Sequence, residues 1–202
     1  MKRILFLILI YPIFYINCYG QSIEELLLNG ASKANRGDFY GAIDDFNNVL
    51  KLNPNSSLAL HNRGAARFFL EFFYMALMDL NKSIELDSTN AGAYCMRGRA
   101  KRKLLDNFGA MQDYNKAIEL NPKYTEAYDY RGSVKFMLQD YRGAIRDYDK
   151  AIELNPKYAQ AYSNRGSAKY KLGDQTNACL DWSKAGELGY TDAYKMIREN
   201  CQ

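Results

Sequence analysis

The nine residues Lys-Ala-Ile-Glu-Leu-Asn-Pro-Lys-Tyr occur twice in this chain, at residues 116–124 and again at 150–158. The two copies begin 34 residues apart, and the longer segments 97–124 and 131–158 agree at 18 of 28 positions. Pro54 stands in the same phase as the prolines of the two copies. A repeat of this length is typical of architectures in which small units pack one after another. The sequence therefore predicts a row of similar units.

Small and acidic residues recur with the same 34-residue period, which extends the pattern over most of the chain. The recurring residues are Gly30, Gly64, Gly98, Gly132 and Gly166; Ala42, Ala76, Ala110, Ala144 and Ala178; and Asp45, Asp79, Asp113, Asp147 and Asp181.

Each unit is predicted to form two helices. In residues 125–158, apolar side chains recur at three- and four-residue steps in two runs, with a turn at 139–141 between them. Asn155 precedes Pro156, which pushes it out of helical geometry and ends the second helix. We expect Gly132 and Ala144 to let the paired helices approach closely, with Tyr148 filling the space beside them.

The spacing of aromatic, glycine, alanine, aromatic and proline at Tyr128, Gly132, Ala144, Tyr148 and Pro156 resembles the tetratricopeptide repeat. The resemblance implies an all-α, right-handed α-solenoid of antiparallel helix pairs with a C-terminal capping helix at 191–200. The domain would span residues 21–202. Its five repeats are predicted at 23–56, 57–90, 91–124, 125–158 and 159–192.

The first twenty residues have the features of a secretory signal peptide. Lys2 and Arg3 precede an apolar run at 4–16, and small residues stand before the favoured cleavage site, Gly20–Gln21. An uncleaved anchor and lipidation at Cys18 are the alternatives. Cleavage would lower the net charge from +4 to +2, because it removes both cations. We therefore expect an exported protein, periplasmic or secreted. We expect membrane association only through partners or an uncleaved N-terminal segment.

Recurring opposite charges predict ion pairs between the two helices of the repeats. Arginine precedes the repeat glycine in four units, and another cation follows four residues later. Pairing would satisfy charges that are costly to bury, whereas the alternative interpretation is a basic track for anions. The sequence does not show whether an aspartate pairs within its own repeat or with the next one. The predicted structural pairs involve Arg63, Arg97, Arg131, Arg165, Asp45, Asp79, Asp113, Asp147 and Asp181.

The family resemblance also implies a binding groove lined by the first helix of each repeat. Carried over position by position, it gives a set in which aromatic side chains and arginines predominate, and both are good anchors for a peptide. Phe68 and Phe69 have inter-repeat packing as their alternative role. The implied partner-binding residues are His61, Asn62, Phe68, Phe69, Arg99, Arg102, Lys103, Asp129, Tyr130, Phe136, Met137, Asn164 and Tyr170.

The chain contains little that predicts catalysis or a metal site. His61 is its only histidine, and a zinc site needs three or four ligands. We expect His61 to lie on a solvated face. No glycine-rich phosphate loop or nucleophile elbow occurs, and a net charge of +4 is too small to imply nucleic acid. No small-molecule cofactor is expected either.

The three cysteines of the processed chain predict one disulfide. Cys179 lies in the last repeat and Cys201 follows the closing helix, so a bond between them would clamp that helix. Two buried thiols are the alternative. Cys95 would then be a lone thiol on the groove side.

These features predict a protein that is not an enzyme. We expect an interaction scaffold or adaptor that binds a peptide or a partner domain in its concave groove. The alternatives are a structural subunit of a cell-envelope or secretion assembly, and a carbohydrate-binding or hydrolytic protein that uses the aromatic groove.

Overall fold

The computed structural model describes residues 22–201. The predicted signal peptide at 1–20 and the terminal Gln202 lie outside this range. The described part contains eleven helices and no strand. The helices are α1 (Ile23–Asn35), α2 (Phe39–Leu52), α3 (Ser57–Phe69), α4 (Phe73–Leu86), α5 (Ala91–Lys103), α6 (Asn107–Leu120), α7 (Thr125–Met137), α8 (Tyr141–Leu154), α9 (Ala159–Lys171), α10 (Gln175–Glu187) and α11 (Ala193–Asn200).

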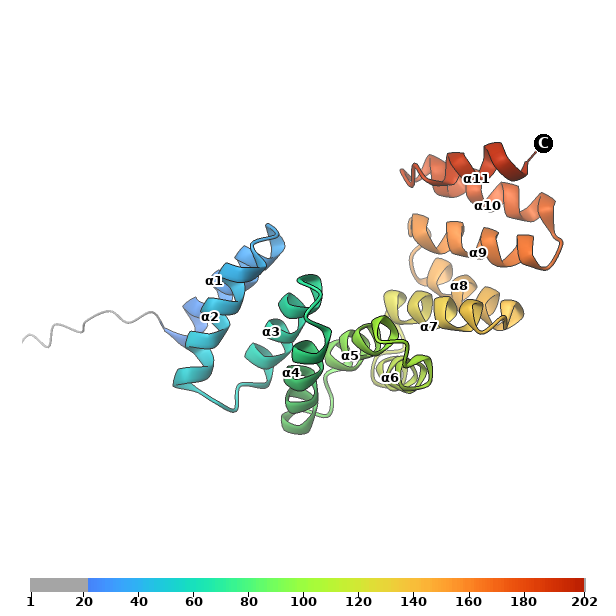
Figure 1. Ribbon diagram of the computed structural model, residues 1–202. Coiled ribbons are helices and arrows are strands. Elements are labelled where there is room, and N and C mark those ends of the chain that lie inside the picture. Colours follow the sequence, from blue (N-terminus) through green and yellow to red (C-terminus); the bar gives the residue numbers. More distant parts are fainter. Residues whose placement is uncertain (1–21, 202) are drawn as a thin grey trace, which may run out of the picture.

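The first ten helices form five antiparallel pairs that stack in chain order. Each pair packs its second helix against the first helix of the next pair, and the row bends into an open arc (Figure 1). The all-α solenoid predicted from the repeat is therefore confirmed. None of the described helices combines the length and apolarity needed to cross a membrane.

Short turns within each pair are set by local chemistry. In four of the five pairs an aspartate caps the second helix, as when Asp140 accepts a hydrogen bond from the Gly143 N–H at 2.9 Å. The residue directly before the N-cap of each second helix has a positive φ, a conformation that glycine adopts most easily. Glycine stands there in the first and last pairs, whereas Leu105 adopts a φ of 66° and exposes its apolar side chain.

One repeat position supplies the largest core side chains. Trp182, Tyr114, Tyr148, Phe46 and Leu80 are all fully buried, and they stand 34 residues apart in the sequence. Each lies against the glycine of the preceding helix. A Cβ atom on Gly132 would lie 2.7 Å from the ring of Tyr148, so the glycine is needed for this close approach. The sequence interpretation of Gly132 and Tyr148 agrees with this packing.

Every recurring arginine lies beside the aspartate of its own repeat. The Arg131 guanidinium donates to both carboxylate oxygens of Asp147, at 2.9 and 2.6 Å. The same arginine reaches back to the Asn115 side chain of the preceding repeat at 2.8 Å. The sequence left the partner open, and the structure places it within the repeat, with a second bond to the neighbour. Arg63, Arg97 and Arg165 are bonded to Asp79, Asp113 and Asp181 in the same way.

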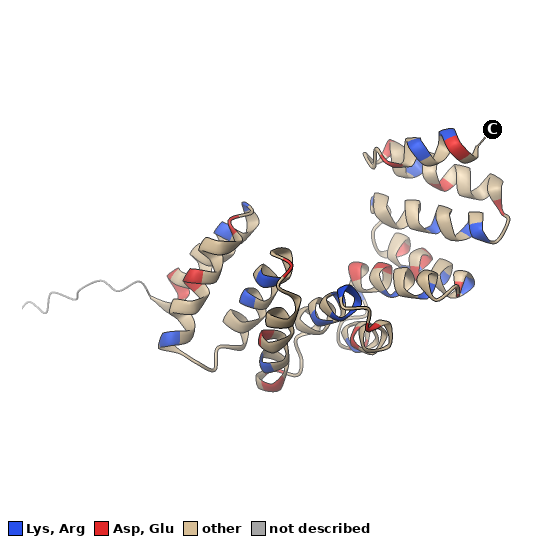
Figure 2. Ribbon diagram, in the orientation of Figure 1, with Lys and Arg blue, Asp and Glu red and all other residues tan. Residues whose placement is uncertain are grey.

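The cation four residues further along completes each cluster. Lys135 lies 2.7 Å from Asp147, so one buried carboxylate meets two cations. In the first repeat, which lacks the arginine, Lys33 is the one described cation that pairs with Asp45, at 2.7 Å. Figure 2 shows that acidic and basic residues both occur along the solenoid.

The helix α11 closes the C-terminal end of the solenoid. Its first residue, Ala193, is buried on α10 together with Trp182. Thr191 and Asp192, which the sequence pattern assigned to the closing helix, form a turn instead. A disulfide joins Cys179 on α10 to Cys201, directly after α11, with their Cα atoms 5.8 Å apart.

Candidate functional site

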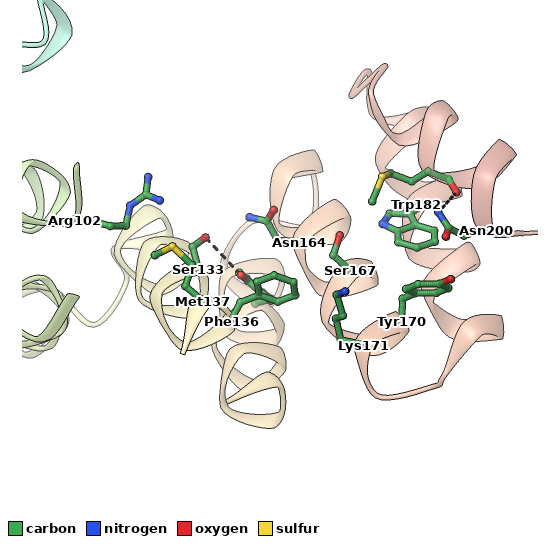
Figure 3. A pocket seen from close by; sticks show the side chains of 12 residues that line it. Arg102, Ser133, Phe136, Met137, Asn164, Ser167, Tyr170, Lys171, Trp182 and Asn200 are labelled. Carbon is green, nitrogen blue, oxygen red and sulfur yellow. Dashed lines mark hydrogen bonds between the residues drawn. The ribbon is translucent and has the colours of Figure 1, made fainter. Parts of the chain in front are cut away.

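A cavity of about 460 Å³ opens between α5 and the C-terminal helices α7–α11, and we call it the C-terminal cavity. It contains five of the residues implied by the family groove: Arg102, Phe136, Met137, Asn164 and Tyr170. Figure 3 shows Arg102 at one end and Asn200 at the other, with Phe136 between them. Three successive repeats and the closing helix thus contribute to one concave site.

Other residues that line the cavity were not among the groove residues implied by the family's repeat positions. Tyr148 and Trp182 form part of it from the core, and Met196 and Asn200 come from α11. Because α11 lies outside the repeat, no repeat position could have pointed to its residues. Ser133 and Ser167 are different, since they stand 34 residues apart on successive first helices and could have been found from that spacing.

A second, more polar cavity of about 450 Å³ adjoins the first and shares Arg102, Ser133 and Asn164 with it. Asp129 lies in this second cavity with only 2% of its surface exposed. Its carboxylate accepts a hydrogen bond of 2.8 Å from the Asn164 side-chain amide. These two predicted groove residues therefore bind each other and link α7 to α9. Tyr130 lines the same cavity.

Burial raises the pKa of Asp129 to about 6. Hydrogen bonds from Asn164 and Tyr158 and the positive charge of Arg102 lower this pKa, and the negative charge of Glu126 raises it. A raised pKa means that the folded protein binds this proton more tightly than the unfolded chain does. Proton binding by Asp129 therefore adds to the free energy of unfolding. This contribution is fully present below about pH 4, the pKa of an aspartate in an unfolded chain. It is lost as the pH rises through about 6.

Asp129→Asn is therefore expected to stabilise the protein at pH 7.5, by up to about 3 kcal/mol, and to change little at pH 4.5. Urea unfolding followed by circular dichroism at both pH values measures this. Asp44→Asn, the same substitution at an exposed aspartate of α2, is the control and should have little effect at either pH. An Asp129→Asn protein that is less stable than the wild type at pH 7.5 would contradict the prediction.

Other implied groove residues lie at the N-terminal end or inside the solenoid. Asn62 and Phe69 line a separate cavity of about 400 Å³, where Phe69 stacks on Phe39 with ring centroids 5.0 Å apart. Phe68 is buried, with 7% of its surface exposed. The Arg99 guanidinium lies 4.5 Å from its ring centroid and 4.9 Å from that of Tyr130. Phe68 and Arg99 thus pack between repeats and do not present a free groove surface.

Two remaining predictions about single residues need correction. His61 is half-buried and lies against Gly92 of α5, where burial lowers its pKa, so it is not a freely solvated side chain. Cys95 is a free thiol, but it is buried in the core between repeats and not on the groove side. Burial raises its pKa to about 12, so it is not a reactive thiolate.

Lys103 is exposed at the end of α5 and does not line either C-terminal cavity. Within residues 22–201, no cluster of three or more His, Cys, Asp or Glu side chains has a geometry that could hold a metal ion.

Comparison with known proteins identifies the repeat. Family models described as "TPR repeat" and "Tetratricopeptide repeat" match residues 132–173 and 91–124. No curated protein matches the chain. Among solved structures, the crystal structure of MamA is 32% identical, with 82% of this chain and 96% of that chain covered and a TM-score of 0.69.

Two further structures share the fold at 18% identity. The PilF protein of Pseudomonas aeruginosa has a TM-score of 0.77, with 83% of this chain and 76% of that chain covered. YrrB, described as "a TPR protein with an unusual peptide-binding site", has a TM-score of 0.67, with 88% and 92% covered. Proteins with this repeat generally act as interaction scaffolds that bind protein or peptide partners. The repeat pattern, the helix-pair solenoid and the MamA similarity together show that this chain belongs to the tetratricopeptide repeat family.

Proposed function

We propose that this protein is an exported, non-enzymatic scaffold that binds a peptide segment of a partner protein in the C-terminal cavity. The observation that carries the proposal is the cavity itself, built from three repeats and the closing helix. Its size suits a few side chains of an extended segment, since binding cavities generally span about 300–1,000 Å³. Its walls combine aromatic and thioether side chains with a few polar groups, which is typical of sites that select a ligand.

Export is part of the proposal and rests on the N-terminal sequence. A charged start, an apolar run and small residues before Gln21 favour secretion into the periplasm or the medium. The Cys179–Cys201 disulfide supports the same location, because disulfides persist mainly in oxidising compartments. It also anchors the chain beside Asn200, which lines the cavity.

A selection from a displayed library of random twelve-residue peptides tests the proposed function. We expect the purified protein to enrich a set of related peptides. Their binding should fall at least tenfold in Ser167→Phe, because the new ring occupies the cavity that Ser167 lines. Ser183→Phe introduces the same ring at an exposed position on α10 and is the matched control.

Each outcome of the selection decides between the alternatives. Peptides that bind Ser167→Phe as tightly as the wild type would show that the cavity is not the site. If no peptide is enriched and the protein is instead retained on a glycan array, the carbohydrate-binding interpretation replaces the proposal. If neither probe binds, a structural subunit that acts through larger protein surfaces becomes the better interpretation.

A further inference from the structure

Arg102 is the one arginine in the described part of the chain that lines the C-terminal cavity, and the repeat does not explain it. The same repeat position holds Ala34, Phe68, Phe136 and Tyr170 in the other units. In contrast, the arginines that recur with the repeat are each bonded to a buried aspartate, as Arg97 is to Asp113. An apolar position has therefore been replaced by a cation in the third repeat alone.

One hydrogen-bond donor of the Arg102 guanidinium, its Nε–H, lacks an acceptor among the described residues. The Nε atom is buried. Arg99, one turn earlier on α5, is by comparison enclosed by the rings of Phe68, Phe69 and Tyr130. Buried donors are normally satisfied, and an exception calls for an explanation such as a missing ligand. Arg102 also lines both C-terminal cavities, where a ligand carboxylate could bond to the terminal nitrogens of its guanidinium group.

Charge in the cavity favours an anionic ligand. Arg102 and Lys171 both line the larger cavity, and none of the described carboxylates lines it. Asp129 in the adjoining polar cavity already accepts the Asn164 amide, and it lies under the surface with 2% exposed. An arginine fork binds a carboxylate through two parallel hydrogen bonds, which gives both strength and orientation.

The remainder of the larger cavity is apolar. Phe136 and Tyr170 contribute aromatic surface, Met137 and Met196 contribute flexible thioether side chains, and the buried Trp182 lies in the wall behind them. Methionine adapts to ligands of different shape, so such walls accept a large aliphatic or aromatic side chain without a single required geometry. Figure 3 shows Arg102 at one end of the cavity and Trp182 toward the other, with Lys171 between them near Tyr170.

We propose that the C-terminal cavity takes a peptide segment in which a large apolar side chain lies a few residues from a carboxylate, with Arg102 binding the carboxylate. This inference rests on the proposed function and specifies its ligand. The carboxylate has two possible sources with one chemistry, an acidic side chain and a chain terminus. Trp182 is the only tryptophan of the chain, so its fluorescence reports directly on this cavity.

The test uses short synthetic peptides that lack tryptophan. Each is a Gly-Ser decapeptide with blocked ends, one phenylalanine and one glutamate, separated by zero to three residues. A matched series replaces glutamate by glutamine, and a third arm has a free C-terminal carboxylate and no glutamate. Binding is measured by Trp182 fluorescence and by calorimetry. At least one carboxylate peptide is expected to bind ten times more tightly than its neutral analogue, a difference of about 1.4 kcal/mol.

Variants of the protein separate the contact from a general charge effect. Arg102→Gln is expected to lower the ratio of the two affinities, carboxylate peptide over neutral peptide, from about tenfold to about one. Arg102→Lys keeps a charge and should retain part of the preference. Arg146→Gln removes an exposed cation on α8 and is the matched control, with no expected effect. Circular dichroism establishes that each variant is folded.

Different results would contradict this inference and the proposed function. Equal binding of carboxylate and neutral peptides, or a preference that survives in Arg102→Gln, would overturn the role of Arg102. So would the absence of any binding in this peptide panel. In each case the random-library selection still decides whether the protein binds peptides in the cavity. Preference for the free C-terminus over glutamate would identify the source of the carboxylate.

Discussion

Replacing Asp147 by alanine is expected to lower the free energy of unfolding by about 3–5 kcal/mol, because two cations would then lose their shared buried partner. Asp147 is 4% exposed and bonds to both Arg131 and Lys135. Arg131 would retain only its bond to Asn115 of the preceding repeat. Since each repeat of a solenoid is stabilised mainly by its neighbours, we expect the loss to be greatest around the third and fourth repeats.

Urea unfolding by circular dichroism measures the size of this effect, and hydrogen exchange of the α7 and α8 amides locates it. Asp149→Ala is the matched control. Asp149 lies two residues later on the same helix and also pairs with an arginine, at 2.7 Å from Arg165, but its side chain is 51% exposed. Exposed ion pairs contribute about 0–1 kcal/mol, so this control should remain close to the wild type.

Equal, small effects of Asp147→Ala and Asp149→Ala would contradict a structural role for the buried pairs. The interpretation of the recurring cations as an anion-binding track would gain support from a different result. That result is an Arg131→Leu protein that is as stable as the wild type but no longer binds an anionic ligand.

Replacing Trp182 by alanine should have an effect of similar size, about 3–5 kcal/mol, since it removes a large buried side chain and leaves a cavity. Trp182 has no exposed surface, and its indole N–H donates to the Ser163 carbonyl at 3.1 Å. Its ring also packs against Tyr170, with ring centroids 5.6 Å apart. The loss is expected to loosen α10 and α11 and to enlarge the adjoining binding cavity.

Two further variants make this prediction specific. Trp182→Tyr introduces the residue found at the same position in the two preceding repeats, Tyr114 and Tyr148, so its loss should be less than half as large. Leu180→Ala removes a side chain that is 63% exposed on the same helix and should cost less than about 1 kcal/mol. Circular dichroism is the appropriate signal, because the alanine variant no longer contains tryptophan. A loss for Trp182→Ala no greater than that for Leu180→Ala would contradict the assigned core role.

The repeat explains how much of the fold was predictable. A residue such as Gly132 has the same surroundings in each unit, so the helix pairs, their close approach and the core position of Tyr148 follow from the period. The pairing of Arg131 with Asp147 was predictable in kind. The sequence did not predict whether the aspartate comes from the same repeat or from a neighbouring one, because both place opposite charges at matching positions. The distance of 2.6 Å between Arg131 and Asp147 in the folded protein identifies the partner within the repeat.

The candidate site was predictable only in part. Family positions identified Arg102, Phe136 and Tyr170, which do line one cavity. The same positions included Phe68, which the packing of neighbouring rings buries. They also included Asp129 and Asn164, which bind each other across two repeats. A repeat position specifies the direction of a side chain from its helix, whereas its exposure depends on which side chains the neighbouring repeats supply.

The sequence by itself determined the 34-residue helix pair and its stacking, since local periodicity and small residues at fixed positions leave only that way to bury the apolar faces. Only the tertiary structure decided where the solenoid has a usable cavity. Met196 and Asn200 of the non-repeating helix α11 close its wall. Arg102 is left there with a buried Nε that has no hydrogen-bond partner within residues 22–201. These properties arise from contacts between residues far apart in the chain, which no single repeat encodes.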